Sequence, residues 1–329
     1  MTITTQLLNT FKAQPFTLKK AYGELEEIKP HSLRARIYEA LGTTFERIDK
    51  GIYQATSDAL STLLIEGNGK DLSFLKDESI DVIITDHPYL DEKAHKGGNR
   101  AFGSEHYESF RYTQSDIMEQ ARVLKQGSFW VQFLPSESAT NFDYLYDIKK
   151  MAENAGFEYY AKTSWKKGSF VANTGRTAKN SEDILIFSKG KARNLRPNAK
   201  ANKAHGVDTG YFMSGASFMI PPTFDFAPDA KAERIHPNQK PVSLLEELIK
   251  LTTLSNDEVV LDMFAGSGVT GIASHNLKRH SILIEKSKEM VGKVIERFSD
   301  LKIGLQVIHY NVVEGLAEIK EETAQLALF

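Results

Sequence analysis

The sequence predicts an α/β domain with a largely parallel sheet, preceded by a small separate module. From residue 58 onward, seven apolar runs typical of strands alternate with helical patterns, and one strand leads directly into a Gly-rich turn and a helix. Before residue 58, two helical patterns precede two short strand-like runs. A chain of 329 residues is long enough for one large domain and a small one.

The N-terminal module, residues 1–57, resembles a winged helix-turn-helix domain. Residues 30–41 begin with Pro and soon reach Ser, which favour a helix start, and they repeat apolar side chains at helical spacing. Residues 45–53 form two β-like runs around Asp-Lys-Gly, as in a hairpin. In winged helices the second helix enters a DNA groove, so Arg34 and Arg36 are candidate DNA contacts. A purely structural or dimerising module is the alternative.

The larger domain, residues 58–329, is expected to contain the following elements. The predicted strands are 63–65, 80–85, 128–133, 157–164, 183–188, 258–262 and 281–285, and the predicted helices include 114–124, 143–155, 242–254 and 269–276. The segment at about 190–235, rich in Lys, Asn, Gly, Ala and Pro, breaks the alternation. Because so long a linker is unusual inside a compact domain, we expect an inserted segment that faces the substrate.

The positive charge of the chain is concentrated in one stretch. The net charge is −2, yet residues 162–203 contain eleven Lys or Arg against two acids. Cationic side chains gain affinity for nucleic acid by neutralising phosphates, so double-stranded DNA is a candidate partner. The candidate contacts in this stretch are Lys166, Lys167, Arg176 and Lys179. An ordinary solvated surface remains the alternative.

Composition excludes several classes of protein. No run of about 18 apolar residues and no secretion signal is present, so we expect a cytoplasmic protein that associates with the nucleoid and not with a membrane. The absence of cysteine excludes disulfides, thiolate metal sites and a Cys nucleophile. The nine histidines show no metal-ligand spacing, so no metal is expected.

A Gly-rich turn indicates a nucleotide-like cofactor. Residues 258–270, EVVLDMFAGSGVT, form a strand, a turn with two glycines and a helix start, which lets a ligand approach the backbone closely. The next strand ends at Glu285, the position from which nucleotide-binding α/β folds contact ribose hydroxyls. A surface acid at the end of a strand is the alternative for Glu285.

Three short segments of the larger domain carry a resemblance: DMFAGSG at 262–268, HPNQKP at 236–241 and DHPY at 86–89. They are similar to the D-x-F-x-G-S-G cofactor motif, the H-P-T-Q-K-P segment and the catalytic D-P-P-Y motif of S-adenosylmethionine-dependent DNA amino-methyltransferases. The resemblance covers residues 58 to about 300. The catalytic motif precedes the cofactor motif, which is the circularly permuted order of the β class. The resemblance therefore implies a Rossmann-like seven-stranded methyltransferase sheet, with target recognition between residues 189 and 236.

The resemblance also assigns the site residues. The cofactor-binding candidates are Asp262, Phe264, Gly266, Ser267, Gly268, Glu285, His236 and Lys240, and the catalytic candidates are Asp86, His87, Pro88 and Tyr89. The Asp86 carboxylate and the carbonyl at position 87 are expected to accept hydrogen bonds from the exocyclic amine. Pro88 restricts the backbone at position 87, and Tyr89 is expected to stack on the flipped base. As core alternatives, Asp86 could cap a helix and Tyr89 could pack in the interior.

An acid at the first motif position favours adenine N6 over cytosine N4 as the target. His87 departs from the family, which has proline there. Three interpretations are open for this residue: an imidazole that tunes base choice, a tolerated replacement whose carbonyl is sufficient, or a weakened enzyme. Two other functions also remain open, namely methylation of RNA or a protein amide, and DNA-binding regulation by an inactive methylase domain.

The C-terminal tail, residues 323–329, holds a candidate docking peptide. Gln325-Leu-Ala-Leu-Phe329 resembles the peptide by which replication and repair proteins bind the bacterial sliding clamp. The alternative is an apolar tail that folds back on its own core. A homodimer is a further expectation, carried over from the β class.

Overall fold

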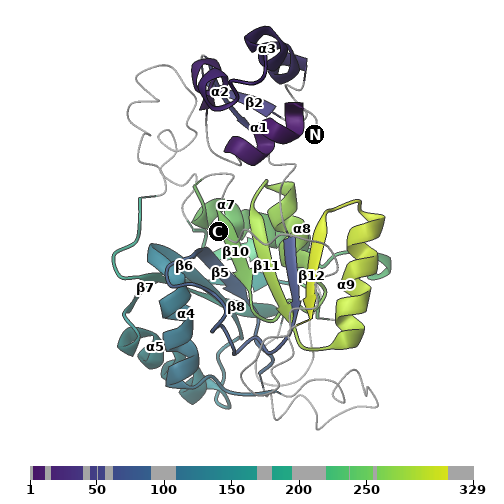
Figure 1. The fold of residues 1–329 in the computed structure, drawn as a ribbon. Coiled ribbons are helices and arrows are strands. Elements are labelled where there is room, and N and C mark those ends of the chain that lie inside the picture. Colours follow the sequence, from purple (N-terminus) through teal and green to yellow (C-terminus); the bar gives the residue numbers. More distant parts are fainter. Residues whose placement is uncertain are drawn as a thin grey trace. The chain divides into compact units, whose positions relative to one another are not determined.

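The computed structural model describes residues 3–11, 16–39, 45–49, 51–55, 62–89, 109–168, 180–194, 220–236, 238–254 and 258–309. The chain divides into two compact units, Met1–Ser61 and Thr62–Phe329 (Figure 1). Several predicted features lie outside the described residues: Arg176, Lys179, most of the 190–235 segment and the tail peptide 325–329.

The described part of the N-terminal unit packs three helices against a small antiparallel sheet. Its elements are α1 (Ile3–Phe11), β1 (Phe16–Thr17), α2 (Leu18–Glu24), α3 (Pro30–Glu39), β2 (Phe45–Asp49) and β3 (Ile52–Ala55), with strand order β1-β3-β2. The Thr17 hydroxyl caps α2 by accepting from the Lys20 amide. The predicted helix and hairpin are confirmed. Arg34 and Arg36 lie exposed on α3, and their DNA contacts stay a prediction.

The C-terminal unit is built on one large mixed sheet. Its strands are β4 (Thr62–Glu66), β5 (Ile80–Thr85), β6 (Leu124–Pro135), β7 (Phe157–Lys166), β8 (Ser181–Lys189), β9 (Thr223–Asp225), β10 (Val259–Asp262), β11 (His280–Glu285) and β12 (Leu305–His309). Their order is β12-β4-β11-β10-β5-β6-β8-β7-β9. All seven predicted strands are present, but the described sheet has nine. The two additional strands, β9 and β12, are short and lie at the two ends of the strand order.

The central strands point in one direction, which brings their ends together. β4, β11, β10, β5 and β6 are mutually parallel along the sheet. We call the side at which these strands end the carboxyl edge, and the side at which they begin the amino edge. β8 is antiparallel to β6 and pairs Glu182 with Pro135. The start of β8 therefore lies at the carboxyl edge.

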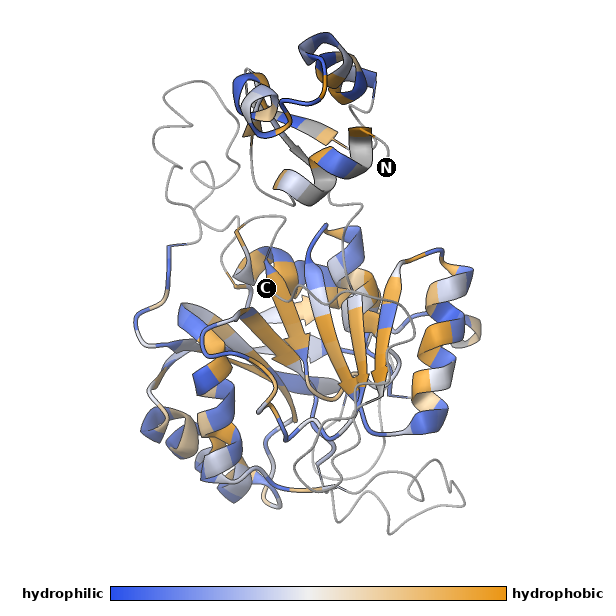
Figure 2. Cartoon of the chain, in the orientation of Figure 1, coloured by the Kyte–Doolittle hydropathy of each residue, from blue (hydrophilic) through white to orange (hydrophobic). Residues whose placement is uncertain are grey.

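Helices cover both faces of this sheet. On one face, α4 (Gln114–Val123) and α5 (Phe142–Asn154) pack on strand residues such as Ile83. On the other, α7 (Val242–Thr252) and α8 (Val269–Asn276) pack on residues such as Val82, and α9 (Lys288–Asp300) packs beside α8. Because alternate side chains of a strand point to opposite faces and both faces are covered, the middles of the central strands are apolar, as Figure 2 shows.

Local signals start the helices of this unit. Thr113 and Asp116 form a capping box at the start of α4, and the Ser287 hydroxyl caps α9. A short 3-10 turn, η2 (Lys231–Glu233), precedes α7. Within the described ranges, no helix is long and apolar enough to cross a membrane.

Candidate active site

Asp86 occupies the carboxyl edge directly after β5. Every residue of β5 is buried, so the strand holds the following backbone in a defined place. The Asp86 side chain is 31% exposed and contacts the Lys240 ammonium through Oδ2. Oδ1 has no hydrogen-bond partner among the described residues. Burial raises the pKa of Asp86, and the Lys240 ammonium acts against this rise. Asp86 thus keeps one acceptor oxygen available.

Lys240 is a buried cation between two acids. Its side chain is 7% exposed, and its Nζ lies 3.0 Å from Glu182 Oε2 as well as against Asp86. The ring centroids of Phe133 and Trp165 lie 5.1 and 5.9 Å from this nitrogen. The pKa of Lys240 is raised, because both carboxylates favour its charged form more than burial disfavours it. The ammonium therefore stays charged within the site.

The Gly-rich turn follows β10 and has the left-handed backbone that glycine favours. Gly266 and Gly268 have φ values of 51° and 73°. A Cβ on Gly266 would come no closer than 4.0 Å to another group, so its backbone faces open space. At Gly268 a Cβ would lie 2.9 Å from Val294 of α9. The first glycine leaves room for a ligand, and the second permits close packing.

Two acids line this turn. Glu285, at the end of β11, accepts hydrogen bonds from the amides of Gly266 at 2.8 Å and Ser287 at 2.7 Å, and burial raises its pKa. Asp262, at the end of β10, accepts from the hydroxyls of Thr85 at 3.0 Å and Thr270 at 2.5 Å. Burial raises the pKa of Asp262 to about 6. Because Thr85 precedes Asp86, its hydroxyl links the β5 end to the turn.

The segment between η2 and α7 is fastened to the same turn. Gln239 accepts from Arg297 at 2.9 Å and donates to Asp229 at 2.9 Å. Arg297 also donates to the carbonyl of Ser267 at 3.2 Å. His236 accepts from the amide of residue 238 at 3.2 Å, and burial lowers its pKa. These bonds hold the segment that carries Lys240 beside the Gly-rich turn.

Comparison with known proteins agrees with this arrangement of motifs. A family model described as DNA methylase matches residues 80–296, well over half of the chain. The chain belongs to this N6/N4 DNA methylase family. It is therefore an S-adenosylmethionine-dependent amino-methyltransferase, and its substrate class is DNA.

Two curated relatives are type II methyltransferases. The methylase is 29% identical to M.HinfI of Haemophilus influenzae over 75% of its own length and 70% of the relative's. It is 27% identical to M2.DpnII of Streptococcus pneumoniae over 67% of its own length and 82% of the relative's.

Two solved structures share the fold. A Thermus thermophilus protein described as a putative DNA modification methylase, in complex with S-adenosyl-L-methionine, matches with a TM-score of 0.52 at 18% identity, over 75% of this chain and 99% of that one. The cytosine-N4-specific PvuII DNA methyltransferase matches with a TM-score of 0.53 at 19% identity, over 74% of this chain and 90% of that one.

The residues of the turn fit the cofactor of the family. Glu285 offers a carboxylate to ribose hydroxyls, the backbone at Gly266 faces open space, and α8 directs its N-terminus at the turn. Phe264 is half-buried, and its ring lies 5.4 Å from that of Phe110. The turn of the methylase thus combines a polar acceptor with apolar rings, as an adenosine group requires.

His87 of the methylase is a buried core residue with both ring nitrogens engaged. Gln132 donates to its Nδ1 at 3.1 Å, so its Nε2 carries the proton and donates to the Tyr144 hydroxyl at 2.6 Å. The Tyr112 ring lies 4.3 Å away. Burial lowers the pKa of His87 to about 3, so the imidazole is neutral. This favours the interpretation in which position 87 contributes its carbonyl. The half-buried Tyr89 ring lies 5.7 Å from the imidazole.

Two of the basic residues that are candidate DNA contacts of the methylase form ion pairs within the chain. Lys166 lies 3.3 Å from Asp225 of β9. Lys167 lies 2.5 Å from Glu182 and covers the Trp165 ring at 5.2 Å. Both lie at or beside the end of β7, which the register with β8 puts at the carboxyl edge. Their contact with DNA stays a prediction.

Sequence reasoning missed the role of Glu182 and of Gln132. Acidic residues directly before the apolar run of β8 were a usable signal for Glu182. No signal was available for Gln132, because its hydrogen bonds to Thr85 and His87 depend on the folded register of β5 and β6. Among the described residues, no group of His, Asp or Glu is arranged to hold a metal ion.

Proposed function

We propose that this methylase transfers a methyl group from S-adenosylmethionine to the N6 amine of adenine in double-stranded DNA. One observation carries the proposal: Asp86 keeps an acceptor oxygen without a partner among the described residues, at the strand end that Thr85 links to the cofactor turn. An active site is where such an unsatisfied acceptor is expected, since structural polar groups are normally paired.

The chemistry needs two acceptors. The lone pair of an exocyclic amine is delocalised into the base, so the nitrogen attacks poorly until its hydrogens are held out of the ring plane. Asp86 Oδ1 and the backbone carbonyl of His87 are the acceptors, and they also stabilise the positive charge that develops on nitrogen. When bound, S-adenosylmethionine supplies the electrophilic methyl group. Glu285 and the backbone at Gly266 hold it in this proposal, which fixes the geometry of the approach.

The target base must leave the helix to reach this edge. Unstacking costs a few kcal/mol, and an aromatic side chain in the site offsets part of that cost. Tyr89 follows Asp86 on the segment that leaves β5, is half-buried, and is the proposed stacking partner. Arg34, Arg36, Lys166 and Lys167 are proposed to contact DNA phosphates.

An acid at the first motif position supports adenine. The cytosine-N4-specific structure with the same fold makes cytosine N4 the second candidate. The names of the two curated relatives support site-specific methylation of the type II kind.

The test is to incubate the full chain with labelled S-adenosylmethionine and unmethylated duplex DNA, and then to digest the DNA to nucleosides. We expect the label in N6-methyladenine. Label in N4-methylcytosine would select the second candidate, and no label in DNA would refute the proposed function.

A further inference from the structure

The Asp86 carboxylate is held by an ion cluster that extends to Glu182 and Lys167. Lys240 Nζ contacts Asp86 Oδ2 and lies 3.0 Å from Glu182 Oε2, and Lys167 lies 2.5 Å from Glu182 Oε1. Two acids and two cations therefore alternate in a row that ends on the catalytic candidate. The sequence resemblance assigned Lys240 to the cofactor, but its Nζ contacts carboxylates.

We propose that Lys240 is a positioning residue for Asp86, which it orients and keeps ionised, and that Glu182 holds Lys240 in turn. This inference rests on the proposed function, in which ionised Asp86 accepts hydrogen bonds from the amine. By occupying Oδ2, Lys240 leaves Oδ1 as the oxygen that faces the substrate.

The surroundings of Lys240 support this role. Its side chain is 7% exposed and that of Glu182 is 12% exposed, so water does not screen their interaction as it would at the surface. The rings of Phe133 and Trp165 flank the ammonium and remove alternative acceptors from its reach. A lysine that only bridged surface acids would not need such enclosure.

Glu182 completes the arrangement. With Lys240 alone, Asp86 would form a tight pair that neutralises the acceptor. Because Glu182 shares the ammonium, the pair between Lys240 and Asp86 is weakened, and Asp86 keeps more of its acceptor strength. Lys167 balances Glu182 from the other side. Among the described residues, electrostatic interactions also connect this cluster with Tyr89, Tyr112, His236 and Asp262.

The inference predicts opposite shifts for two variants. Activity requires ionised Asp86, so the rate falls as the pH drops through the Asp86 pKa. Lys240 lowers that pKa and Glu182 raises it. Lys240→Met should therefore move the acid limb of the rate profile to higher pH, and Glu182→Gln should move it to lower pH.

The measurement is the single-turnover rate of methyl transfer to a short duplex from about pH 5 to about pH 9, the range in which perturbed carboxyl groups titrate. Cofactor affinity is measured separately by calorimetry. Lys240→Arg, which keeps the charge, should retain most of the wild-type profile. The matched controls are Lys250→Met and Glu247→Gln, which alter an exposed pair on α7 that is 3.8 Å apart. Both controls should leave the profile unchanged.

If the acid limb of the Lys240→Met rate profile stays at the wild-type pH and cofactor binding is weaker, the inference is overturned. Lys240 is then a cofactor-binding residue. If Lys240→Met does not fold, Glu182→Gln decides: a profile that does not move to lower pH overturns the inference. Asp86→Ala distinguishes a failure of the proposed mechanism from a failure of this inference. If Asp86→Ala still methylates DNA, the proposed mechanism fails; if it is inactive and the shifts are absent, only this inference fails.

Discussion

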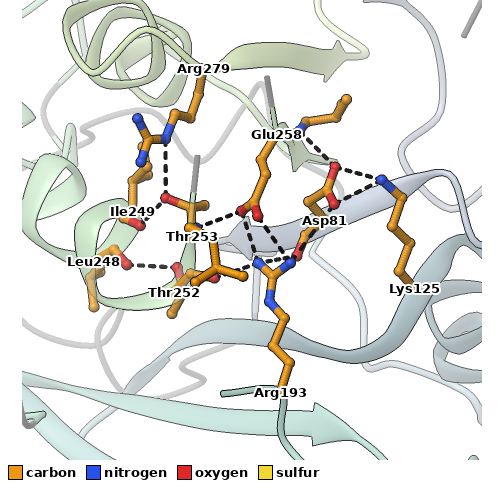
Figure 3. Close-up of polar contacts among 11 residues, drawn as sticks. Asp81, Lys125, Arg193, Leu248, Ile249, Thr252, Thr253, Glu258 and Arg279 are labelled. Atoms are coloured by element: carbon orange, nitrogen blue, oxygen red, sulfur yellow. Dashed lines mark hydrogen bonds and ion pairs between the residues drawn. The ribbon is translucent and has the colours of Figure 1, made fainter. Parts of the chain in front are cut away.

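Two charged clusters lie at opposite edges of the same sheet. They differ in whether every carboxylate oxygen accepts a hydrogen bond from the protein. At the amino edge, both oxygens of Asp81 accept from Lys125, at 2.8 and 2.9 Å, and Oδ2 also accepts from the amide of Val259 at 3.0 Å. Arg193 donates to both oxygens of Glu258, at 3.1 and 2.9 Å. Figure 3 shows these acids meeting their donors.

The cluster at the carboxyl edge also combines acids with cations, but its carboxylates lack some hydrogen-bond donors. Asp86 lies at the far end of the strand that begins beside Asp81, yet one of its oxygens has no donor in the described structure. Buried polar groups without partners cost free energy, and the described residues hold several of them, Arg193 Nε at the amino edge included. Asp86 Oδ1 differs because it is a carboxylate oxygen beside the cofactor turn, where a substrate amine can complete it. The amino edge therefore stabilises the fold, and the carboxyl edge keeps an acceptor for the substrate.

The largest effect should come from replacing Asp86 by asparagine, compared with the same replacement at Asp81. Asp86→Asn should lower the single-turnover rate by about 10²–10⁴-fold, because the carboxylate that accepts from the amine is lost. Asp81→Asn should retain methyl transfer in the folded protein. It should lower the free energy of unfolding, because the Lys125 ammonium loses its carboxylate partner. Rates and urea unfolding of both variants check the contrast. Equal loss of activity in the two variants would remove the distinction between the edges.

Arg193→Met should be the strongest change to stability at the amino edge. Removing this cation leaves the buried Glu258 carboxylate without its charged partner and with only the Leu254 amide as a donor, and breaking such a pair costs about 3 kcal/mol. Thermal or urea unfolding measures the loss, and Lys191→Met, at an exposed neighbour, is the control, with an expected change within about 0.5 kcal/mol. A variant as stable as wild type would show that the cluster does not support the fold.

Glu285→Ala should have a smaller effect, mainly on cofactor binding, with some loss of stability because the amides of Gly266 and Ser287 lose their acceptor. Loss of the carboxylate should weaken S-adenosylmethionine binding by about tenfold, or ~1.4 kcal/mol, the scale of one charged hydrogen bond. Calorimetric titration provides the affinity, and Glu296→Ala, exposed on α9, is the control. Unchanged affinity would remove Glu285 from the cofactor site.

His87→Pro should have the smallest effect on activity. The substitution keeps the backbone carbonyl, so the transfer rate should stay within a few-fold of wild type. It removes the partner of Gln132 and Tyr144, so the free energy of unfolding should fall by about 1–3 kcal/mol. A folded but inactive variant would show that the imidazole takes part in the chemistry.

The sequence predicted the carboxyl edge because its motifs lie at strand ends. Asp86, Asp262 and Glu285 each follow or end an apolar strand, and parallel strands bring such ends together. The contact between Lys240 and Asp86 was not predictable, since it joins segments 154 residues apart. The edge strand β9 was missed because three residues are too few to show a period. The edge strand β12 was missed although its five residues, LQVIH, include three apolar ones.

The most direct test of the account is a crystal structure of the methylase with duplex DNA and an unreactive analogue of S-adenosylmethionine. The account predicts a flipped adenine whose N6 lies about 2.6–3.2 Å from Asp86 Oδ1, a hydrogen-bond distance. Lys240 should remain on Oδ2. A target base whose amine contacts another group, with Oδ1 still lacking a partner, would contradict it.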